Sequence, residues 1–297
     1  TVILGVTPLT KLIFDEEFPE LKKIDLPPYN ITYSKILPLW IKLTLSYPEI
    51  ADIIKKENKL LENIIKENDI EIVISDNRFG LYSKKIHSVF ITHQLSLKAP
   101  VFETIGNKIN RSYISNFNEV WVPDYEEERK SLSGELSHSN HFHKNVKYIG
   151  PQSRLNDVIT DIENDKYDYL ILLSGPEPSR TELETVLFEK MKSTTKRIAF
   201  VRGSKLKVES LKLENVEFFD FPTKEELKKL ILSSKKIICR SGYSTLMDMH
   251  LLGKKELILI PTPGQTEQEY LASYWKEKFG AVSMKQNEIN KLLTFTS

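Results

Sequence analysis

The residues of this chain whose types and spacing best fit a chemical site lie between Cys239 and Asp248. A short apolar run, Lys236 to Cys239, predicts a buried strand; Ser241-Gly242 predicts a turn, and Tyr243 to Leu252 a helix that ends at Gly253. The first N–H groups of a helix lack intrahelical partners, and the helix dipole favours negative charge there. A strand, a small-residue turn and a helix N-terminus therefore predict a site for an anion.

Three side chains extend this anion site along the predicted helix. Ser244 and Thr245 add hydroxyl donors in the first turn, and Asp248 lies four residues after Ser244, one turn further along the same face. A carboxylate there can accept two hydrogen bonds from a ribose diol while the N-terminus holds a phosphate. The pattern predicts a nucleoside diphosphate site. A simpler interpretation stays open, in which Ser241 caps the helix and Asp248 is a solvated helix residue.

Composition limits the classes of protein to which the chain can belong. Its 297 residues, 40% hydrophobic and 28% charged, are enough for one large or two smaller packed domains. A net charge of +1 gives no overall field for nucleic acid, and no run approaches the ~18 apolar residues of a membrane span. The single cysteine excludes a disulfide framework, and Thr1 to Leu4 lack the basic segment of a signal peptide. We therefore expect a cytoplasmic protein.

Short β-branched runs alternate with helical patterns, which predicts an α/β fold around parallel sheets. A polar, turn-rich stretch at 151–166 suggests a boundary, so we expect one domain at 1–150 and another at 151–297. The expected strands are these: Val2–Val6, Leu21–Ile24, Ile70–Ser75, Ser88–Thr92, Glu119–Val122, Tyr169–Leu173, Arg197–Val201, Val216–Phe221, Lys236–Cys239 and Leu257–Ile260.

Three strands of the first half end in polar side chains, namely Asp76, His93 and Asp124. Ligands of open parallel sheets bind beyond the carboxyl ends of the strands, so these residues are candidates to line one site. Each also has a structural interpretation. Asp76 would cap a turn, Asp124 would cap the Glu-rich helix expected after it, and His93 would be a hydrogen-bonded core histidine.

Other stretches of the first half carry weaker signals. Ser34 to Tyr47 is apolar with interspersed lysines, which fits a membrane-surface helix, a core helix or a lid. Pro48 to Asn68 has one apolar stripe and predicts a scaffold helix. The histidine-rich stretch from Ser137 to His143 has no carboxylate or cysteine nearby in sequence, so we predict a solvated loop there rather than a metal site.

In the second half, two further strand ends carry candidate residues. Ser174-Gly175 follows the strand at Tyr169–Leu173 and precedes a helix, a second and weaker anion site because Pro176 and Pro178 stiffen it. Arg202-Gly203 follows the strand at Arg197–Val201. Thr223-x-x-Glu226 predicts a capping box at the start of a helix.

The second half resembles the donor half of glycosyltransferase family 28. The resemblance rests on Arg240-Ser241-Gly242, Ser244-Thr245, the acid at 248, Ile260-Pro261 and Glu267-Gln268 followed by Ala272, and it covers nearly all of 168–284. The family includes the bacterial N-acetylglucosaminyltransferase that completes the lipid-linked peptidoglycan precursor. The first half is similar to the N-terminal domain of uncharacterised bacterial relatives through Ser75–Ser83 and Ile91–Gln94.

The resemblance implies the GT-B fold, two Rossmann-like domains facing a cleft, with the acceptor on 1–150 and the nucleotide sugar on 151–297. It implies that Asp248 binds the ribose, that Ser244 and Thr245 face the diphosphate, and that Phe219 sits where backbone groups bind uracil. The remaining residues that it assigns to the donor site are Ser174, Gly175, Arg202, Gly203, Arg240, Ser241, Gly242, Gln265, Glu267 and Gln268, the last of which addresses the sugar hydroxyls.

The chain departs from the family pattern at several positions. Pro176 stands in the donor loop, Asp248 replaces the usual Glu, and Leu271 stands where many members have Asn. These departures leave the identity of the sugar open. The family's first strand and its Gly-rich, His-containing loop have no counterpart before Val2, so we expect about 30 residues of a β-α-β unit to be missing.

The reaction implied is inverting sugar transfer from a nucleotide diphosphate sugar, UDP-linked, to an acceptor hydroxyl. No metal or cofactor is required if helix N-termini and Arg240 or Arg202 stabilise the leaving diphosphate, although either arginine fits a structural role. His93 and Asp76 are the candidate bases, and His93 is preferred because histidine titrates near neutrality.

The partners expected are a UDP-sugar and an acceptor that fits a lipid-linked molecule at the inner face of the cell membrane, part of the cell envelope. Ile36 to Leu45 provides an apolar surface for it. Two alternatives stay open: a nucleotide-sugar hydrolase or epimerase on the same fold, and a non-catalytic nucleotide-binding protein.

Overall fold

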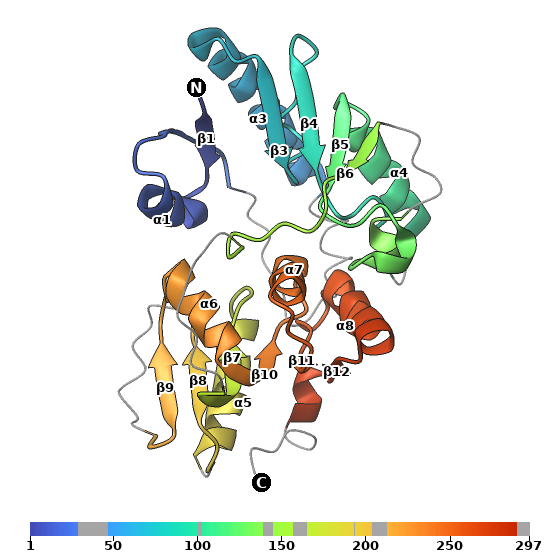
Figure 1. Cartoon of the computed structure of the whole chain (residues 1–297). Coiled ribbons are helices and arrows are strands. Elements are labelled where there is room, and N and C mark those ends of the chain that lie inside the picture. Colours follow the sequence, from blue (N-terminus) through green and yellow to red (C-terminus); the bar gives the residue numbers. More distant parts are fainter. Residues whose placement is uncertain are drawn as a thin grey trace. The chain divides into compact units, whose positions relative to one another are not determined.

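The computed structural model describes residues 1–28, 47–99, 103–138, 145–156, 165–192, 194–203 and 213–289. The chain forms two compact units (Figure 1). The N-terminal unit comprises residues 1–92, 105–122 and 141–147, and the C-terminal unit comprises residues 93–104, 123–140 and 148–297. The apolar stretch predicted from Ser34 onward lies outside the described residues up to residue 46, as does the histidine-rich stretch beyond His138.

In its described part, the N-terminal unit contains two sheets. Strands β1 (Ile3–Val6) and β2 (Lys22–Asp25) pair in parallel, joined through α1 (Pro8–Glu17). The second sheet has the order β3 (Ile72–Asp76), β4 (His87–Ile91), β5 (Glu119–Val122) and β6 (Val146–Tyr148), and its first three strands are parallel. The α/β character predicted for this half is confirmed.

Two helices accompany these strands: α3 (Tyr47–Asn68), as predicted, and α4 (Glu103–Ile114), which we did not predict. The buried face of α4 includes two asparagines, Asn107 and Asn110. These polar side chains interrupt the apolar period by which a buried helix face is identified in a sequence.

The motif Ser75–Ser83 ties the end of β3 to helix α3. The Arg78 Nε donates to Glu57 Oε1 over 2.6 Å, and this α3 carboxylate is fully buried. The Ser75 hydroxyl donates to the Arg78 carbonyl at 2.6 Å. A Cβ at Gly80 would lie 2.5 Å from the Ile54 carbonyl oxygen, so the close approach of α3 requires glycine. Much of this motif is therefore architectural.

In the described part of the C-terminal unit, six parallel strands are arranged in the order β12-β11-β10-β7-β8-β9 (Figure 1). This is the doubly wound order, with the chain reversing direction across the sheet between β7 and β10. The strands are β7 (Tyr167–Leu172), β8 (Ile198–Val201), β9 (Val216–Phe219), β10 (Ser234–Cys239), β11 (Leu257–Leu259) and β12 (Val282–Ser283).

Four helices connect these strands, namely α5 (Ser179–Met191), α6 (Lys224–Leu232), α7 (Tyr243–Leu251) and α8 (Thr266–Phe279). The predicted capping box of α6 is confirmed, with Thr223 and Glu226 each accepting from the other's backbone N–H. The helix predicted from Tyr243 ends one residue earlier than expected, and Gly253 follows it with φ +68°.

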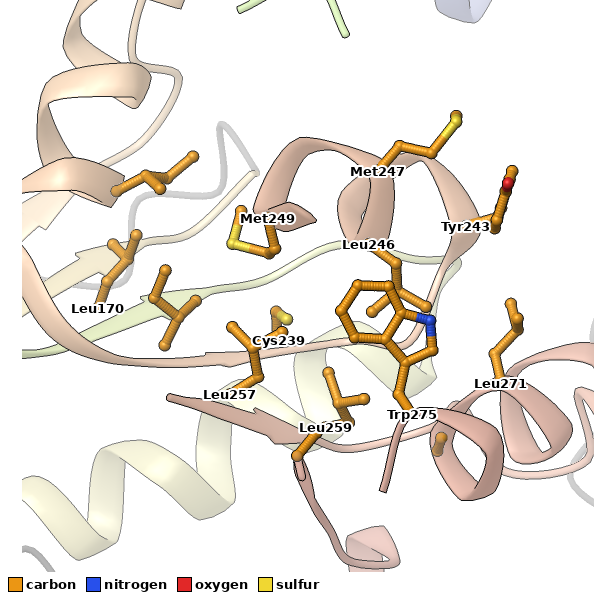
Figure 2. Packing of buried hydrophobic residues seen from close by; sticks show 14 of the residues in the cluster. Leu170, Cys239, Tyr243, Leu246, Met247, Met249, Leu257, Leu259, Leu271 and Trp275 are labelled. Carbon is orange, nitrogen blue, oxygen red and sulfur yellow. The ribbon is translucent and has the colours of Figure 1, made fainter. Parts of the chain in front are cut away.

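Each face of this sheet is covered by a separate apolar cluster. Leu170 and Cys239 belong to the cluster under α7 and α8, whereas Ile171 and Ile238, next to them in sequence, belong to the other. Strands buried on both faces need continuous apolar runs, as β7 and β10 have. Figure 2 shows Leu246 of α7 and Trp275 of α8 over Leu257 and Leu259.

The segment after Asp124 corrects one prediction. No α-helix follows this residue; the chain forms two short 3₁₀ turns, Glu128–Lys130 and Gly134–Leu136. A third, Gln286–Glu288, lies near the end of the described chain. The Asp124 side chain does not cap a helix: it is fully buried and holds the following loop, 125–137, by hydrogen bonds.

That loop packs against α8. The Trp275 indole donates to the Leu132 carbonyl at 2.8 Å, and the Tyr274 hydroxyl donates to the Ser131 carbonyl at 2.9 Å. A Cβ at Gly134, where φ is +56°, would lie 2.5 Å from the Tyr270 hydroxyl.

None of the described helices combines the length and the apolarity that crossing a membrane requires.

Candidate functional site

The N-terminus of α7 lies at the carboxyl end of β10, beside the point where strand order reverses. Its N-cap is Gly242, with extended backbone (φ −71°, ψ 139°) and no side-chain cap. The first-turn N–H groups are therefore left without a side-chain acceptor, as an anion site needs. Ser244 in this turn is exposed and Thr245 half-buried.

Ser241 does not cap this helix, so that structural alternative is wrong. Its hydroxyl is buried and donates to the Gln268 carbonyl at 2.7 Å, which fastens the turn before α7 to helix α8. Ser241 thus supports the helix N-terminus through packing.

Asp248 lies one turn beyond Ser244 on α7 and is half-buried. Its Oδ1 accepts a hydrogen bond of 2.5 Å from the Ser153 hydroxyl. Burial raises the pKa of Asp248, and the Ser153 hydrogen bond and the charge of Arg154 oppose this only in part. The carboxylate is therefore not the solvated helix residue of the structural alternative.

The loop after β7 provides a second strand-end element. Ser174 and Gly175 are exposed, and Gly175 has φ +98°, a conformation that strongly favours glycine. Helix α5 begins shortly after, with Pro178 as an N-cap that offers no side-chain acceptor. A Cβ at Gly175 would lie 3.6 Å from the Thr262 hydroxyl, so this loop lies against the loop after β11.

Arg240 occupies a structural position. It is buried, and its guanidinium donates to the carbonyls of Ile260 (3.1 Å), Pro261 (3.2 Å) and Ser179 (2.8 Å). A further bond of 2.8 Å reaches Gln286 Oε1. Burial lowers the pKa of Arg240 to about 10. The side chain joins the backbone at Ile260 and Pro261 to the backbone at Ser179 and to the side chain of Gln286.

Arg202 is also buried. Its Nε donates to Glu184 Oε1 at 2.6 Å, and its Nη1 lies 3.4 Å from Asp220 Oδ1. Its backbone N–H donates to the Phe219 carbonyl at 2.8 Å. Gly203, with φ +62°, donates to the Asp220 carbonyl at 3.0 Å. Arg202, Gly203 and Phe219 thus lie together at the ends of β8 and β9.

The loop from β11 to α8 carries the remaining predicted donor residues. Gln265 is the N-cap of α8 and makes no side-chain cap hydrogen bond. The Thr262 N–H donates to Gln268 Oε1 at 2.9 Å, which fixes the amide of Gln268. Glu267 Oε1 lies 2.8 Å from His93 Nε2.

His93 belongs to the C-terminal unit although it follows a strand of the N-terminal unit. Its ring stacks on Tyr243, the first residue of α7, with centroids 4.1 Å apart and planes at 18°. The Tyr243 hydroxyl donates to the Pro123 carbonyl at 2.8 Å, which holds that ring in place. The candidate base therefore lies beside the α7 N-terminus and Glu267.

Asp76 and Asp124, the other two polar residues predicted at strand ends, lie in different units. Asp76 is exposed at the end of β3 in the N-terminal unit. Asp124 is fully buried in the C-terminal unit and serves the loop that follows it. Within the described ranges, no group of three or more His, Cys, Asp or Glu residues is placed to hold a metal ion.

The sequence did not predict a role in the site for three residues near it. They are Ser153, Thr262 and Tyr243, whose ring stacks on His93. Thr262 lies inside a loop that the sequence marks, between Pro261 and Pro263. Ser153 carries no signal, because its partner is 95 residues away.

Residues 152–294 match the family model described as the glycosyltransferase family 28 C-terminal domain. The match covers just under half of the chain, and with the structures described below it shows that the chain is a glycosyltransferase. The sequence resemblance is thereby confirmed for the second half. No curated protein matches the chain in sequence.

Solved glycosyltransferase structures share the fold of the whole chain. The calicheamicin glycosyltransferase CalG4 has 12% identity and a TM-score of 0.58, covering 96% of this chain and 78% of its own. The spinosyn rhamnosyltransferase SpnG has 8% identity and a TM-score of 0.61, and the match covers 95% of this chain and 77% of SpnG. UGT89C1 of Arabidopsis thaliana, complexed with UDP-L-rhamnose, has 12% identity and a TM-score of 0.55, and the match covers 97% of this chain and 78% of UGT89C1. The predicted GT-B class of α/β fold is confirmed.

Proposed function

We propose that this glycosyltransferase moves a sugar from a nucleotide diphosphate sugar, UDP-linked, to an acceptor hydroxyl, with inversion and without a metal ion. The C-terminal unit holds the donor and the N-terminal unit the acceptor. UGT89C1, similar in fold, was solved with UDP-L-rhamnose and with UDP, which supports a uridine nucleotide here.

The observation that carries the proposal is the pairing of an uncapped helix N-terminus with a half-buried carboxylate one turn away. Gly242 leaves the first N–H groups of α7 without a side-chain acceptor, and Asp248 lies on the same helix with Ser153 on one oxygen. The N-terminus binds the diphosphate, and Asp248 accepts hydrogen bonds from the ribose hydroxyls. The start of α5 is already occupied by a carboxylate, since the Thr181 N–H donates to Glu177 Oε2 at 3.2 Å.

In this proposal, backbone N–H groups stabilise the negative charge that develops on the departing nucleoside diphosphate. Arg240 and Arg202 are buried among carbonyls and carboxylates, so they hold the loops that present those groups. Fixed dipoles of this kind stabilise the developing negative charge without reorganising during the reaction.

We propose His93 as the general base, with Asp76 as the second candidate. Glu267, at 2.8 Å from Nε2, fixes the imidazole, and the Tyr243 ring supports it from one face. A histidine held in this way can take the proton of the acceptor hydroxyl. The acceptor is lipid-linked and the enzyme works at the inner face of the cell membrane, as the apolar stretch Ile36–Leu45 suggests.

The test is titration calorimetry with UDP, GDP and dTDP on the wild type and on Asp248→Asn. The amide keeps an acceptor for Ser153 while losing the charge that holds the ribose. We expect UDP to bind tightest and the variant to bind it at least tenfold more weakly, or about 1.4 kcal/mol. Affinity should also fall in acid, beginning at a pH above the usual range of aspartate, because burial raises the pKa of Asp248.

A stability control accompanies the binding data. The raised pKa means that ionised Asp248 disfavours the folded state at pH 7, so Asp248→Asn should unfold at no lower urea concentration than the wild type. Absence of binding by any nucleotide would sink the donor proposal. UDP binding with hydrolysis and no transfer to any hydroxyl acceptor would point to the hydrolase alternative.

A further inference from the structure

The hydroxyl of Thr262 is a buried polar group without a hydrogen-bond partner in the described part of the chain. The residue is 1% exposed and follows Pro261, three residues after the last residue of β11. Native proteins satisfy nearly all buried hydroxyls, so a hydroxyl left alone calls for a specific reason. The backbone of the same residue is engaged, since its N–H donates to Gln268 Oε1 at 2.9 Å.

The position of this hydroxyl is set by its neighbours. Arg240 holds the two preceding carbonyls, of Ile260 and Pro261, at 3.1 and 3.2 Å. Gln268, from α8, holds the Thr262 N–H. These bonds fix the chain before the Thr262 Cα, and the Gln265 N–H fixes it after the Cα by donating to the Thr262 carbonyl at 3.1 Å. The hydroxyl is therefore preorganised without being used.

The strand order places this hydroxyl among the elements that favour an anion. Strand β10 lies between β7 and β11, and the contact between Gly175 and Thr262 joins the loops that follow those outer strands. Arg240, the residue after β10, also donates to the Ser179 carbonyl at the start of α5. The N-terminus of α7 and the Thr262 hydroxyl thus share the carboxyl end of the sheet's centre, whereas the first turn of α5 is bound by the Glu177 carboxylate.

We propose that the Thr262 hydroxyl donates a hydrogen bond to a phosphate oxygen of the bound nucleoside diphosphate. The inference rests on the proposed function, because it assigns a further ligand contact at the same donor site. The exposed loop at Ser174-Gly175 lies beside the hydroxyl. The proposed contact requires that the nucleotide displace this loop as it binds. A Cβ at Gly175 would lie 3.6 Å from Thr262 Oγ1, in van der Waals contact with the hydroxyl, and glycine leaves that position without a side chain.

Thr262→Val tests the proposal, because it replaces the hydroxyl by a methyl group of nearly the same volume. Thr262→Ser is the matched control, since it keeps the hydroxyl and removes the methyl. Titration calorimetry with UDP and with uridine is combined with thermal unfolding of each protein. A hydrogen bond to a charged oxygen is among the stronger kinds, so we expect UDP to bind Thr262→Val about tenfold or more weakly.

Three further results are expected. Uridine, which has no phosphate, should bind Thr262→Val as it binds the wild type. Thr262→Ser should bind UDP within about threefold of the wild type. The melting temperature of Thr262→Val should not be lower, because the valine removes an unsatisfied buried group. A hydroxyl with a purely structural partner would give the opposite result, a lower melting temperature with unchanged UDP affinity.

The outcomes separate this inference from the proposed function. Unchanged UDP affinity in Thr262→Val, with the wild type binding UDP, would overturn the Thr262 contact and leave the donor site intact. A loss seen with a UDP-sugar but not with UDP would also overturn it, because the hydroxyl would then address the sugar. A wild type that binds no UDP would overturn the proposed function itself.

Discussion

Replacing Asp124 by asparagine changes one carboxylate oxygen to an NH₂ group, yet we expect it to lower the free energy of unfolding of the C-terminal unit strongly. Among the described residues, six donors reach this carboxylate, and each lies within 3.1 Å. They are the N–H groups of Tyr125, Leu132 and Ser133 and the hydroxyls of Ser131, Ser133 and Ser137. The carboxylate is fully buried, so water cannot replace a lost partner.

The magnitude follows from what an amide can still do. With its oxygen in place of Oδ1, it keeps the N–H groups of Tyr125 and Leu132, and its NH₂ can donate to serine hydroxyls, which rotate to accept. The Ser133 N–H, 3.1 Å from Oδ2, then faces another donor. Two bonds are lost, that of the Ser133 N–H and that of one serine hydroxyl, because the NH₂ group has two hydrogens for three hydroxyls. The charge assistance of the remaining bonds also disappears. Since bonds to a charged group contribute about 1.5–3 kcal/mol each, we expect a loss of about 3–6 kcal/mol.

Urea unfolding at pH 7, followed by circular dichroism and tryptophan fluorescence, measures this loss. Trp275 reports on the loop directly, because its indole donates to the Leu132 carbonyl. Ser137→Ala is the control: it removes one hydroxyl and leaves the carboxylate with its other donors, so about 1–2 kcal/mol is expected. A free energy of unfolding for Asp124→Asn within 0.5 kcal/mol of the wild type would refute the claim that the charge holds the loop.

The pH dependence gives a second check. Burial opposes ionisation of Asp124, but the Leu132 N–H and the three serine hydroxyls together outweigh it and lower the pKa below the usual 3.8. A depressed folded-state pKa gives stability that is fully present above the unfolded value and is lost as pH falls through the folded one. The difference between wild type and Asp124→Asn should therefore be constant from about pH 5 to 8 and shrink in acid.

Three shorter predictions concern the strand ends of the same sheet. Arg240→Lys should lower the free energy of unfolding by about 3 kcal/mol or more in urea, because one ammonium cannot serve the carbonyls of Ile260, Pro261 and Ser179. Gly175→Ala should cost about 1–3 kcal/mol in the same assay and weaken UDP binding, since φ is +98°; unchanged values would contradict the assigned conformation. Cys239 should resist a disulfide reagent in the native protein and react fully in urea, because burial raises its pKa to about 12; rapid native reaction would show that β10 is accessible.

The sequence by itself determined the local elements of the second half. An apolar run, a Ser-Gly turn and an amphipathic continuation were enough to predict β10 and α7 nearly to the residue, and Thr223-x-x-Glu226 predicted the start of α6. These features depend on backbone preferences and contacts within a few residues, which a sequence displays directly. Resemblance at Arg240 to Asp248 then indicated the family, and the match over 152–294 confirmed it.

Tertiary structure alone decided what most of the polar residues do. Asp124 was expected to cap a helix and instead holds a loop from within the core, and Ser241 binds α8 instead of capping α7. His93 and Glu267 are 174 residues apart in sequence, yet their side chains meet at 2.8 Å. A polar side chain at a strand end takes its role from burial and from the partners that folding brings to it, and neither is set by its neighbours in sequence.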